Sequence, residues 1–294
     1  MTYKKRKISP IDYIVIPAVI TGIIFFYYRI KNGLHYNWDW GAIPQYIFRF
    51  DTEKAKWLPN LLMQGLFNTI RLSVWGIIFA TILGIIMGLF RVSKSLFRRL
   101  LGGTYVELVR NTPPLVIIFI FYFFFSSQII PLLRLDEFIN SAGDSTLKII
   151  SILFGRPAMF PTFLSAIVTM SIFEGAYVTE IIRAGIASVD RGQWEASYAL
   201  GLNRYQQYRH IILPQATQRV LLPLAGQFIS TIKDSAIVSV ISIQELTFQG
   251  MELMSATYLT FETWITIAFM YLILSISLSL LIGRLDAYMR RKTV

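Results

Sequence analysis

Long stretches without a charged side chain constrain the fold of this chain more than any other feature. Residues 72–90 and 112–133 contain no Asp, Glu, Lys or Arg. A helix needs about 20 apolar residues to cross the hydrocarbon core of a bilayer, so each stretch is about long enough to span a membrane. Only 15% of the residues are charged, whereas soluble domains average about a quarter. The sequence therefore predicts an integral membrane protein whose core is a helical bundle.

Six apolar segments are expected to cross the membrane, which makes the predicted fold class an all-α membrane protein with six transmembrane helices. Their approximate bounds are 13–28, 62–90, 112–133, 161–182, 220–244 and 263–283. Six spans place both termini and the loops at 91–110 and 183–219 on one side. That side holds 18 Lys and Arg residues and the opposite side holds 8. Because cytoplasmic loops carry the excess of positive charge, both termini are predicted to be cytoplasmic.

The net charge of +11 does not call for a nucleic-acid partner. In a membrane protein, basic loops set the orientation, so we expect contact with lipid and no nucleic-acid binding. The chain has no cysteine, and its two histidines, His35 and His210, lie far apart in the sequence. Thiol chemistry and cysteine metal sites are therefore excluded, and no metal-ligand spacing is present.

The first 59 residues are expected to form a separate N-terminal region. A basic run at 4–7 precedes the apolar residues 13–28, and no small-residue cleavage site follows. This arrangement predicts a retained extra helix in place of a removed signal peptide. Residues 31–59 mix tryptophans, prolines and charges, which is typical of an external segment at the membrane interface. Residues 60–285 carry the other five spans, and residues 286–294 form a basic cytoplasmic tail.

The second span contains two glycines, Gly84 and Gly88, that stand four residues apart. Small residues at this spacing lie on one face of a helix and allow a second helix to approach closely. We therefore expect a close helix contact in this part of the bundle.

A polar segment at 190–214 separates two of the apolar spans. Asp190 and Gln193 stand at capping-box spacing, so the carboxylate can accept from first-turn N–H groups and the amide can reach back. Asn203 and Gln206 repeat this spacing. The segment is therefore predicted to contain two short helices.

Two further residues set the expected ends of these helices. Gly201 can take the left-handed conformation that ends a helix. Pro214 disfavours helix at the residue before it, so the second helix is expected to end ahead of Pro214.

The polar segment also carries a recognisable pattern. It reads Glu195-Ala196-Ser197, three residues, Gly201, nine residues, Ile211, one residue, and Leu213-Pro214. This resembles the EAA motif of the membrane subunits of ABC importers, from which it departs only at Ser197, where alanine is usual. Four neighbouring segments look like the polar amino-acid branch, the histidine, glutamine and arginine type. They are YVELVRNTPPL at 105–115, AYVTEIIRAGIASVDRGQWEA at 176–196, LPQA at 213–216 and IKDSAIVSVISIQEL at 232–246.

The resemblance covers most of residues 60–285 and implies a type I ABC importer permease fold. It implies that the 190–214 helices are coupling helices that dock on a separate ATP-binding subunit. Glu195 would be the charged contact, Gly201 the hinge, and Pro214 the end of the motif. Trp194, Ala196 and Leu200 would form the apolar docking face. The alternative is an amphipathic segment that lies on the lipid surface.

The resemblance also implies partners. These are a dimer of ATP-binding subunits, a second permease subunit that is identical or related, and an external amino-acid-binding protein, assembled at a bacterial inner membrane. No Gly-Lys pair occurs in the chain, so no Walker A loop can form and ATP with Mg²⁺ would bind to the partner. We therefore expect a transport subunit without catalytic residues or a cofactor of its own.

Ionisable residues inside the predicted spans are candidates for the substrate path, because charge within a membrane is costly. Glu174 lies about midway along the fourth span, at a position that is more often small or hydroxylated in the resembling family. An unpaired carboxylate there would bind the side chain of a cationic amino acid. The alternative is a structural hydrogen bond, or an ion pair with Arg71 or Lys233.

The fifth span adds further candidates for the same path. Lys233 and Asp234 are adjacent, so on a helix they point about 100° apart and each needs its own partner. Lys233 would hold a substrate carboxylate or make a structural ion pair. Gln227 and Ser230 lie one to two turns earlier and are expected to line the path.

The sequence therefore predicts the transmembrane subunit of an ATP-driven importer of a polar amino acid, with a cationic one as the narrower hypothesis. An ion-coupled secondary amino-acid transporter is the alternative. It would show an internal repeat between the two halves of the chain, and none is recognisable. A membrane-embedded enzyme would need clustered catalytic groups, which two isolated histidines do not supply. The identity of the amino acid and of the second permease, and the role of residues 31–59, stay open.

Overall fold

The computed structural model describes residues 11–33, 36–53 and 55–291, and the chain divides into two compact units between Trp40 and Gly41. The first unit contains α1 (Asp12–Gly33), so the expected first helix is formed. Its apolar part, Tyr13–Gly22, is shorter than a span, and a membrane crossing by α1 stays a prediction. The basic run at 4–7 lies outside the described residues, and the predicted division at residue 59 also stays a prediction.

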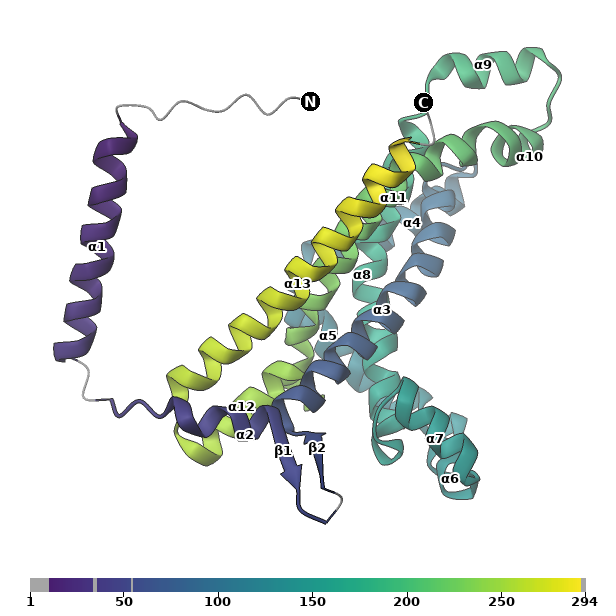
Figure 1. The fold of residues 1–294 in the computed structure, drawn as a ribbon. Coiled ribbons are helices and arrows are strands. Elements are labelled where there is room, and N and C mark those ends of the chain that lie inside the picture. Colours follow the sequence, from purple (N-terminus) through teal and green to yellow (C-terminus); the bar gives the residue numbers. More distant parts are fainter. Residues whose placement is uncertain (1–10, 34–35, 54, 292–294) are drawn as a thin grey trace. The chain divides into compact units, whose positions relative to one another are not determined.

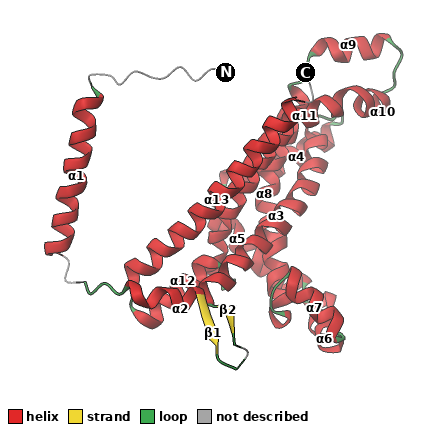
Figure 2. Cartoon of the chain, viewed as in Figure 1, coloured by secondary structure: helices red, strands yellow, loops and turns green. Residues whose placement is uncertain are grey.

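The second unit is a bundle of helices with one small hairpin (Figures 1 and 2). Its longer helices are α3 (Leu61–Arg91), α4 (Leu96–Asn111), α5 (Pro114–Phe124), α8 (Phe160–Ala187), α11 (Leu213–Asp234), α12 (Leu246–Thr257) and α13 (Thr260–Arg291). Its shorter helices are α2 (Ile43–Ile47), α6 (Leu135–Ser141), α7 (Asp144–Leu153), α9 (Arg191–Ala199) and α10 (Arg204–Gln207).

Five helical segments of the described chain are long and apolar enough to cross a membrane. They are Leu61–Arg91, Pro114–Leu133, Pro157–Ala187, Arg204–Ile241 and Thr260–Arg284. These match the second to sixth predicted spans, with ends that extend beyond several of them. The orientation of the chain in the membrane stays a prediction. The predicted tail at 286–294 begins within α13, and residues 292–294 lie outside the described part.

The two glycines of α3 lie in close contact with α8. A methyl group added at Gly84 would overlap Val178, and one added at Gly88 would overlap Ile182. The predicted close approach of a second helix is therefore confirmed. Because the contact advances toward the C-terminus on both helices, α3 and α8 run parallel and begin at the same end of the bundle.

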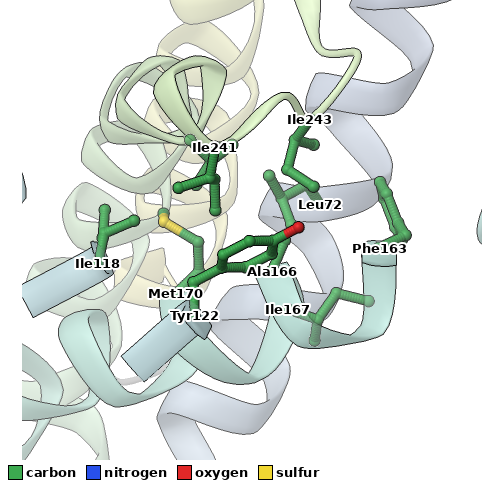
Figure 3. Packing of buried hydrophobic residues seen from close by; sticks show 10 residues of the cluster. Leu72, Ile118, Tyr122, Phe163, Ala166, Ile167, Met170, Ile241 and Ile243 are labelled. Atoms are coloured by element: carbon green, nitrogen blue, oxygen red, sulfur yellow. The ribbon is translucent and has the colours of Figure 1, made fainter. Parts of the chain in front are cut away.

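The largest buried apolar cluster lies where α3, α5, α8 and the 3-10 helix Ser235–Ile241 meet (Figure 3). Its best-buried members come from these different elements: Leu72, Ile118, Ile167, Met170 and Val238. Inside a membrane such a cluster is stabilised by van der Waals packing, because lipid tails are as apolar as these side chains. The cluster fixes the starts of α3 and α8 against the end of the α11 segment.

A two-stranded antiparallel sheet departs from the all-α expectation. β1 (Phe48–Asp51) pairs with β2 (Lys56–Pro59), with Phe50 opposite Trp57. Aromatic residues favour strands, and residues 52, 53 and 55 lie in turns between the two strands. The composition of residues 31–59 predicts an interfacial segment but does not predict this hairpin.

Two segments that were expected to be loops contain helices. α4 begins at Leu96, inside the predicted 91–110 loop, and buries Val106 and Val109 against the bundle. The segment between the third and fourth predicted spans contains α6 and α7, whose residues are mostly exposed. Hydropathy alone does not distinguish such short amphipathic helices from loops, because their polar faces lower the average.

Candidate functional site

The 190–214 segment begins as expected, with α9 capped by Asp190. The Asp190 carboxylate accepts a hydrogen bond from the backbone N–H of Gly192 at 2.7 Å. Gln193 does not reach back to complete a capping box. Its Oε1 instead accepts from Nε2 of Gln215 at 3.1 Å, so the first predicted box is wrong and this side chain links α9 to the start of α11.

The second predicted capping box is confirmed. The Asn203 side chain accepts from the backbone N–H of Gln206 at 3.0 Å, and the Gln206 side chain accepts from the backbone N–H of Asn203 at 2.9 Å. Gly201 lies between the two helices with a φ of +74°, the left-handed conformation that was expected there. The two short helices are therefore joined at a glycine and separately capped.

The expected end of the second helix before Pro214 is wrong. Residues Tyr208–Ile212 form a π-helical segment that joins α10 to α11 without a break. In this segment hydrogen bonds run five residues back, as from the Leu213 N–H to the Tyr208 carbonyl. Single π-helical turns occur inside α-helices, and this one directly precedes Leu213 and Pro214. The loop helix is thus continuous with a membrane-spanning helix.

The predicted docking residues of the loop divide into two groups. Trp194 is half-buried and packs inward, with its ring edge-to-face against Tyr208 at 5.3 Å between centroids. Glu195, Ala196 and Leu200 are exposed, and Leu200 keeps 76% of its surface accessible.

The loop carries two more exposed apolar side chains that the motif did not identify. Tyr198 is 79% exposed and Tyr205 is 69% exposed. Large aromatic side chains in an otherwise polar segment were the available signal. With Leu200 they give the loop an apolar outer surface, which we call the loop surface.

Glu174 and Gln227 are brought together although they lie 53 positions apart in the sequence. Glu174 lies midway along α8 and is fully buried. Its Oε2 accepts a hydrogen bond from Nε2 of Gln227, on α11, at 2.7 Å. Its Oε1 is also buried and makes no hydrogen bond of normal geometry with the described residues, although the side chains of Thr231 and Asp234 lie close to the carboxyl group. Because buried polar atoms are nearly always paired, this oxygen is a candidate acceptor for a ligand.

The two cations considered as partners of Glu174 point elsewhere. Arg71 donates from Nε to the Ile152 carbonyl and from Nη1 to Oδ1 of Asn68, both at 2.9 Å. Lys233 is exposed and makes no ion pair with the described residues. The ion-pair alternative for Glu174 is therefore wrong, while the structural hydrogen bond is present in the contact with Gln227.

The other two path candidates lie on the same helix as Gln227. Ser230 is half-buried about one turn further along α11, and Asp234 is half-buried at the end of that helix. Lys233 is exposed and takes no part in the hydrogen bond between Gln227 and Glu174.

A cavity of about 540 Å³ lies beside Gln227, between α4, α8 and α11. Arg110, Tyr177, Glu180 and Arg219 also line it. The Arg110 guanidinium lies over the Tyr177 ring, 5.5 Å from its centroid. The volume is in the range of small-molecule sites, and the lining combines charged groups with an aromatic face. Sequence reasoning did not connect these residues, because they come from three helices.

Glu180 on the cavity wall is neutralised by two arginines. Its Oε2 lies 2.8 Å from Nη1 of Arg91, and its Oε1 accepts from Arg183. These pairs tie the end of α3 to α8 and leave the wall with the positive charges of Arg110 and Arg219.

A second buried carboxylate, Glu245, is bonded much more completely. It accepts from the backbone N–H groups of Thr247 at 2.9 Å and Phe248 at 2.7 Å, which caps α12. It also accepts from the Tyr271 hydroxyl at 2.8 Å and from the Thr69 hydroxyl at 3.3 Å. Glu245 lies outside the candidate spans, and burial raises its pKa to about 7. Nothing in the local sequence predicted this network, in which Thr69 lies 176 positions before Glu245.

A helical bundle with an incompletely paired buried carboxylate and a capped loop at one end is typical of a membrane transport protein. The family described as the inner membrane component of binding-protein-dependent transport systems matches residues 80–291. Because the match covers more than half of the chain, the chain belongs to this family.

Individual relatives agree with the family. The glutamine transport system permease protein GlnP of Escherichia coli (strain K12) is 30% identical over 264 residues, which are 87% of this chain and 99% of the relative. The L-cystine transport system permease protein TcyB of Bacillus subtilis (strain 168) is 34% identical over 237 residues, 79% of this chain and 89% of the relative. The predicted resemblance to permease subunits of amino-acid ABC importers is confirmed, and these relatives are transport subunits and not enzymes.

A solved structure has the same fold. The crystal structure of an amino acid ABC transporter with histidines superposes with a TM-score of 0.64 at 28% sequence identity, over 86% of this chain and all of the compared chain. The ion-coupled secondary transporter, which was the alternative, gains no support from these comparisons.

Proposed function

We propose that this chain is the transmembrane subunit of an ATP-driven importer that moves a polar amino acid across the bacterial inner membrane. The observation that carries the proposal is the loop surface on a separately capped helix pair. Its second helix continues through α11 to Gln227, which contacts Glu174. A push on the loop is therefore carried by a continuous helix to the middle of the bundle.

The loop surface is the docking site for a separate ATP-binding subunit. Leu200, Tyr198 and Tyr205 supply apolar area, and the exposed Glu195 supplies a charged contact. Trp194 packs against its own chain and supports the loop from behind. A dimer of such subunits would bind ATP and Mg²⁺, because this chain has no Gly-Lys pair with which to form a phosphate-binding loop.

The buried carboxylate selects the cargo. Glu174 offers a free acceptor oxygen that suits the cationic side chain of arginine, lysine or histidine. Gln227 holds the other oxygen and also lines the 540 Å³ cavity, so the cavity and the carboxylate belong to one path. Ser230 and Asp234 extend this path along α11, and Lys233 faces outward.

The assembly contains a second permease subunit and an external amino-acid-binding protein. A single helical bundle encloses only a small part of a transport pathway. Glu174 is buried in the bundle and Lys233 is exposed on its surface, so a second subunit related by a two-fold axis would complete the pathway. The binding protein would deliver the amino acid at the end of the bundle opposite the loop surface.

The proposal is tested by disrupting the loop surface without touching the bundle. We expect Leu200→Ser to abolish most co-purification with the ATP-binding subunit and most ATP-dependent uptake in proteoliposomes, because it removes the central apolar contact. Ile149→Ser is the matched control, since Ile149 is 58% exposed on α7 and lies outside the candidate spans. Uptake and subunit binding that survive Leu200→Ser, Tyr205→Ser and Glu195→Ala together would contradict the proposal.

A further inference from the structure

Three arginines converge on a cavity of about 420 Å³ at the end of the bundle where α3 and α8 begin. Arg49 comes from β1, Arg71 from α3, and Arg156 from the segment that leads into α8. We call this cavity the three-arginine pocket. The loop surface follows the end of α8, so the pocket and the loop surface lie at opposite ends of these parallel helices.

Two of the three arginines lie outside the candidate spans. Arg49 and Arg156 are exposed and belong to segments on either side of the spans that α3 and α8 form. Arg71 is the eleventh of the 31 residues of α3 and reaches the same cavity from the first third of that helix. The exposed side chains of Arg49 and Arg156 make the pocket accessible from water.

The positive charge of the pocket is not neutralised by the described residues. No Asp or Glu is among the residues that line the cavity, and none of the three arginines makes an ion pair with a described residue. The hydrogen-bond acceptors of Arg71 and Arg156 are neutral. Arg71 donates to Asn68 and to a carbonyl, and Arg156 donates from Nη2 to Oε1 of Gln64 at 3.1 Å. These bonds orient the guanidinium groups and leave further N–H donors unoccupied, since each guanidinium has five.

The hairpin beside the pocket presents a different surface on its other face. Alternate residues of a strand point to opposite faces, so Arg49 and Leu58 face the pocket while Phe50 and Trp57 face away from it. Phe50 is 51% exposed and Trp57 is 68% exposed, and their rings make an edge-to-face contact at 5.5 Å. Arginines next to exposed aromatic side chains are the composition of protein–protein contact sites.

We propose that the three-arginine pocket receives a carboxylate side chain from an acidic segment of a protein that docks on this end of the bundle. Guanidinium groups bind carboxylates through paired hydrogen bonds, and several of them around one cavity require an anionic occupant. The proposal rests on the proposed function for the orientation that makes this end external. A phospholipid head group is the competing occupant, and the test below separates it from a protein.

The test measures binding of a fluorescent tetra-glutamate peptide to the full chain in phosphatidylcholine nanodiscs, by anisotropy. A tetra-glutamine peptide is the uncharged comparison. We expect Arg49→Gln with Arg156→Gln to weaken tetra-glutamate binding about tenfold or more. The control is Arg134→Gln with Lys148→Gln, which removes the same charge from two other exposed positions. Arg134 lies just before α6 and Lys148 lies on α7, and we expect this pair to weaken binding less than twofold.

Several results would overturn the proposal. Equal weakening by both double variants would mean that only the overall charge matters. Displacement of the peptide by free glutamate at an equal carboxylate concentration would make the pocket a small-molecule site. The amount of phosphatidylglycerol that co-purifies with each protein is measured as well. If the double variant loses this lipid but binds tetra-glutamate as wild type does, the pocket binds a lipid head group.

Two measurements keep the result interpretable. The melting temperature of each variant shows whether it is folded, and the single exposed substitution Arg49→Gln replaces the pair if the double variant is unstable. Peptide binding requires neither ATP nor uptake, so a failed binding test leaves the proposed transport function standing and a failed uptake test leaves the pocket standing.

Discussion

The two fully buried carboxylates, Glu174 and Glu245, have opposite surroundings. Both side chains have no accessible surface. Glu245 accepts four hydrogen bonds from three parts of the chain. Glu174 accepts one, from Gln227, and its other buried oxygen makes none of normal geometry with the described residues.

The difference separates a structural carboxylate from one with unused binding capacity. Glu245 joins α3, α12 and α13 through Thr69 and Tyr271, so its network is complete without any ligand. Glu174 lies in the middle of a spanning helix and is incompletely satisfied, which is unfavourable unless something else occupies the site. Burial alone therefore does not identify a functional carboxylate. The number of hydrogen bonds that the buried carboxylate accepts distinguishes the two residues.

The largest effect is expected from removing the complete network. Glu245→Ala leaves the backbone N–H groups at the start of α12 and the Tyr271 hydroxyl without acceptors, which we expect to destabilise the fold by about 3–5 kcal/mol. Thermal unfolding of the purified protein measures this loss. Glu252→Ala, an exposed glutamate on the same helix, is the matched control and should change little. An unchanged melting temperature for Glu245→Ala would show that Glu245 does not stabilise the fold.

The next effect is a pH dependence that belongs to Glu245. Its carboxyl has a pKa of about 7 in the folded protein against an ordinary value of 4.5, so the folded state binds more protons between these values. Stability is then highest below about pH 4.5 and falls by on the order of 2–3 kcal/mol as the pH rises to 7. We expect melting temperatures of the Glu245→Gln variant to lack this slope. The same slope in both proteins would assign it to other groups.

The smallest effect on stability is expected from Glu174→Gln, which should instead reduce transport. Glu174→Gln preserves the size of the side chain and can keep a hydrogen bond to Gln227, so the melting temperature should stay near that of wild type. Uptake of a cationic amino acid should fall about tenfold, equivalent to 1.4 kcal/mol, because the charge that binds it is lost. Glu137→Gln, on exposed α6, is the control. Intact uptake, or a large drop in melting temperature, would make Glu174 structural.

The features that could be predicted from the sequence are local. Five spans follow from hydropathy, because a membrane imposes length and composition on each segment separately. The cap at Asn203 and the left-handed Gly201 depend on residues within one or two turns. The Gly84 contact was also predictable, since only small residues permit such an approach.

The features that could not be predicted depend on contacts between distant positions. Gln227 reaches Glu174 only because α11 packs on α8, and Thr69 reaches Glu245 across 176 positions. Trp194 was assigned to the outer surface, but helical periodicity in a nine-residue helix does not say which face its own bundle covers. The passage of a helix through Pro214 also escaped prediction, because it depends on a π-helical segment that propensities do not describe.

That π-helical segment also has a geometric consequence for the path. Successive residues of an α-helix are rotated by about 100°, so one additional residue in a turn rotates everything beyond it by that angle. Tyr208–Ile212 thus sets the angular phase between Tyr205 on the outside and Gln227 within the bundle. In an uninterrupted α-helix of the same sequence, Gln227 would point about a quarter turn away from Glu174. The loop surface and the buried carboxylate are aligned by one short irregularity.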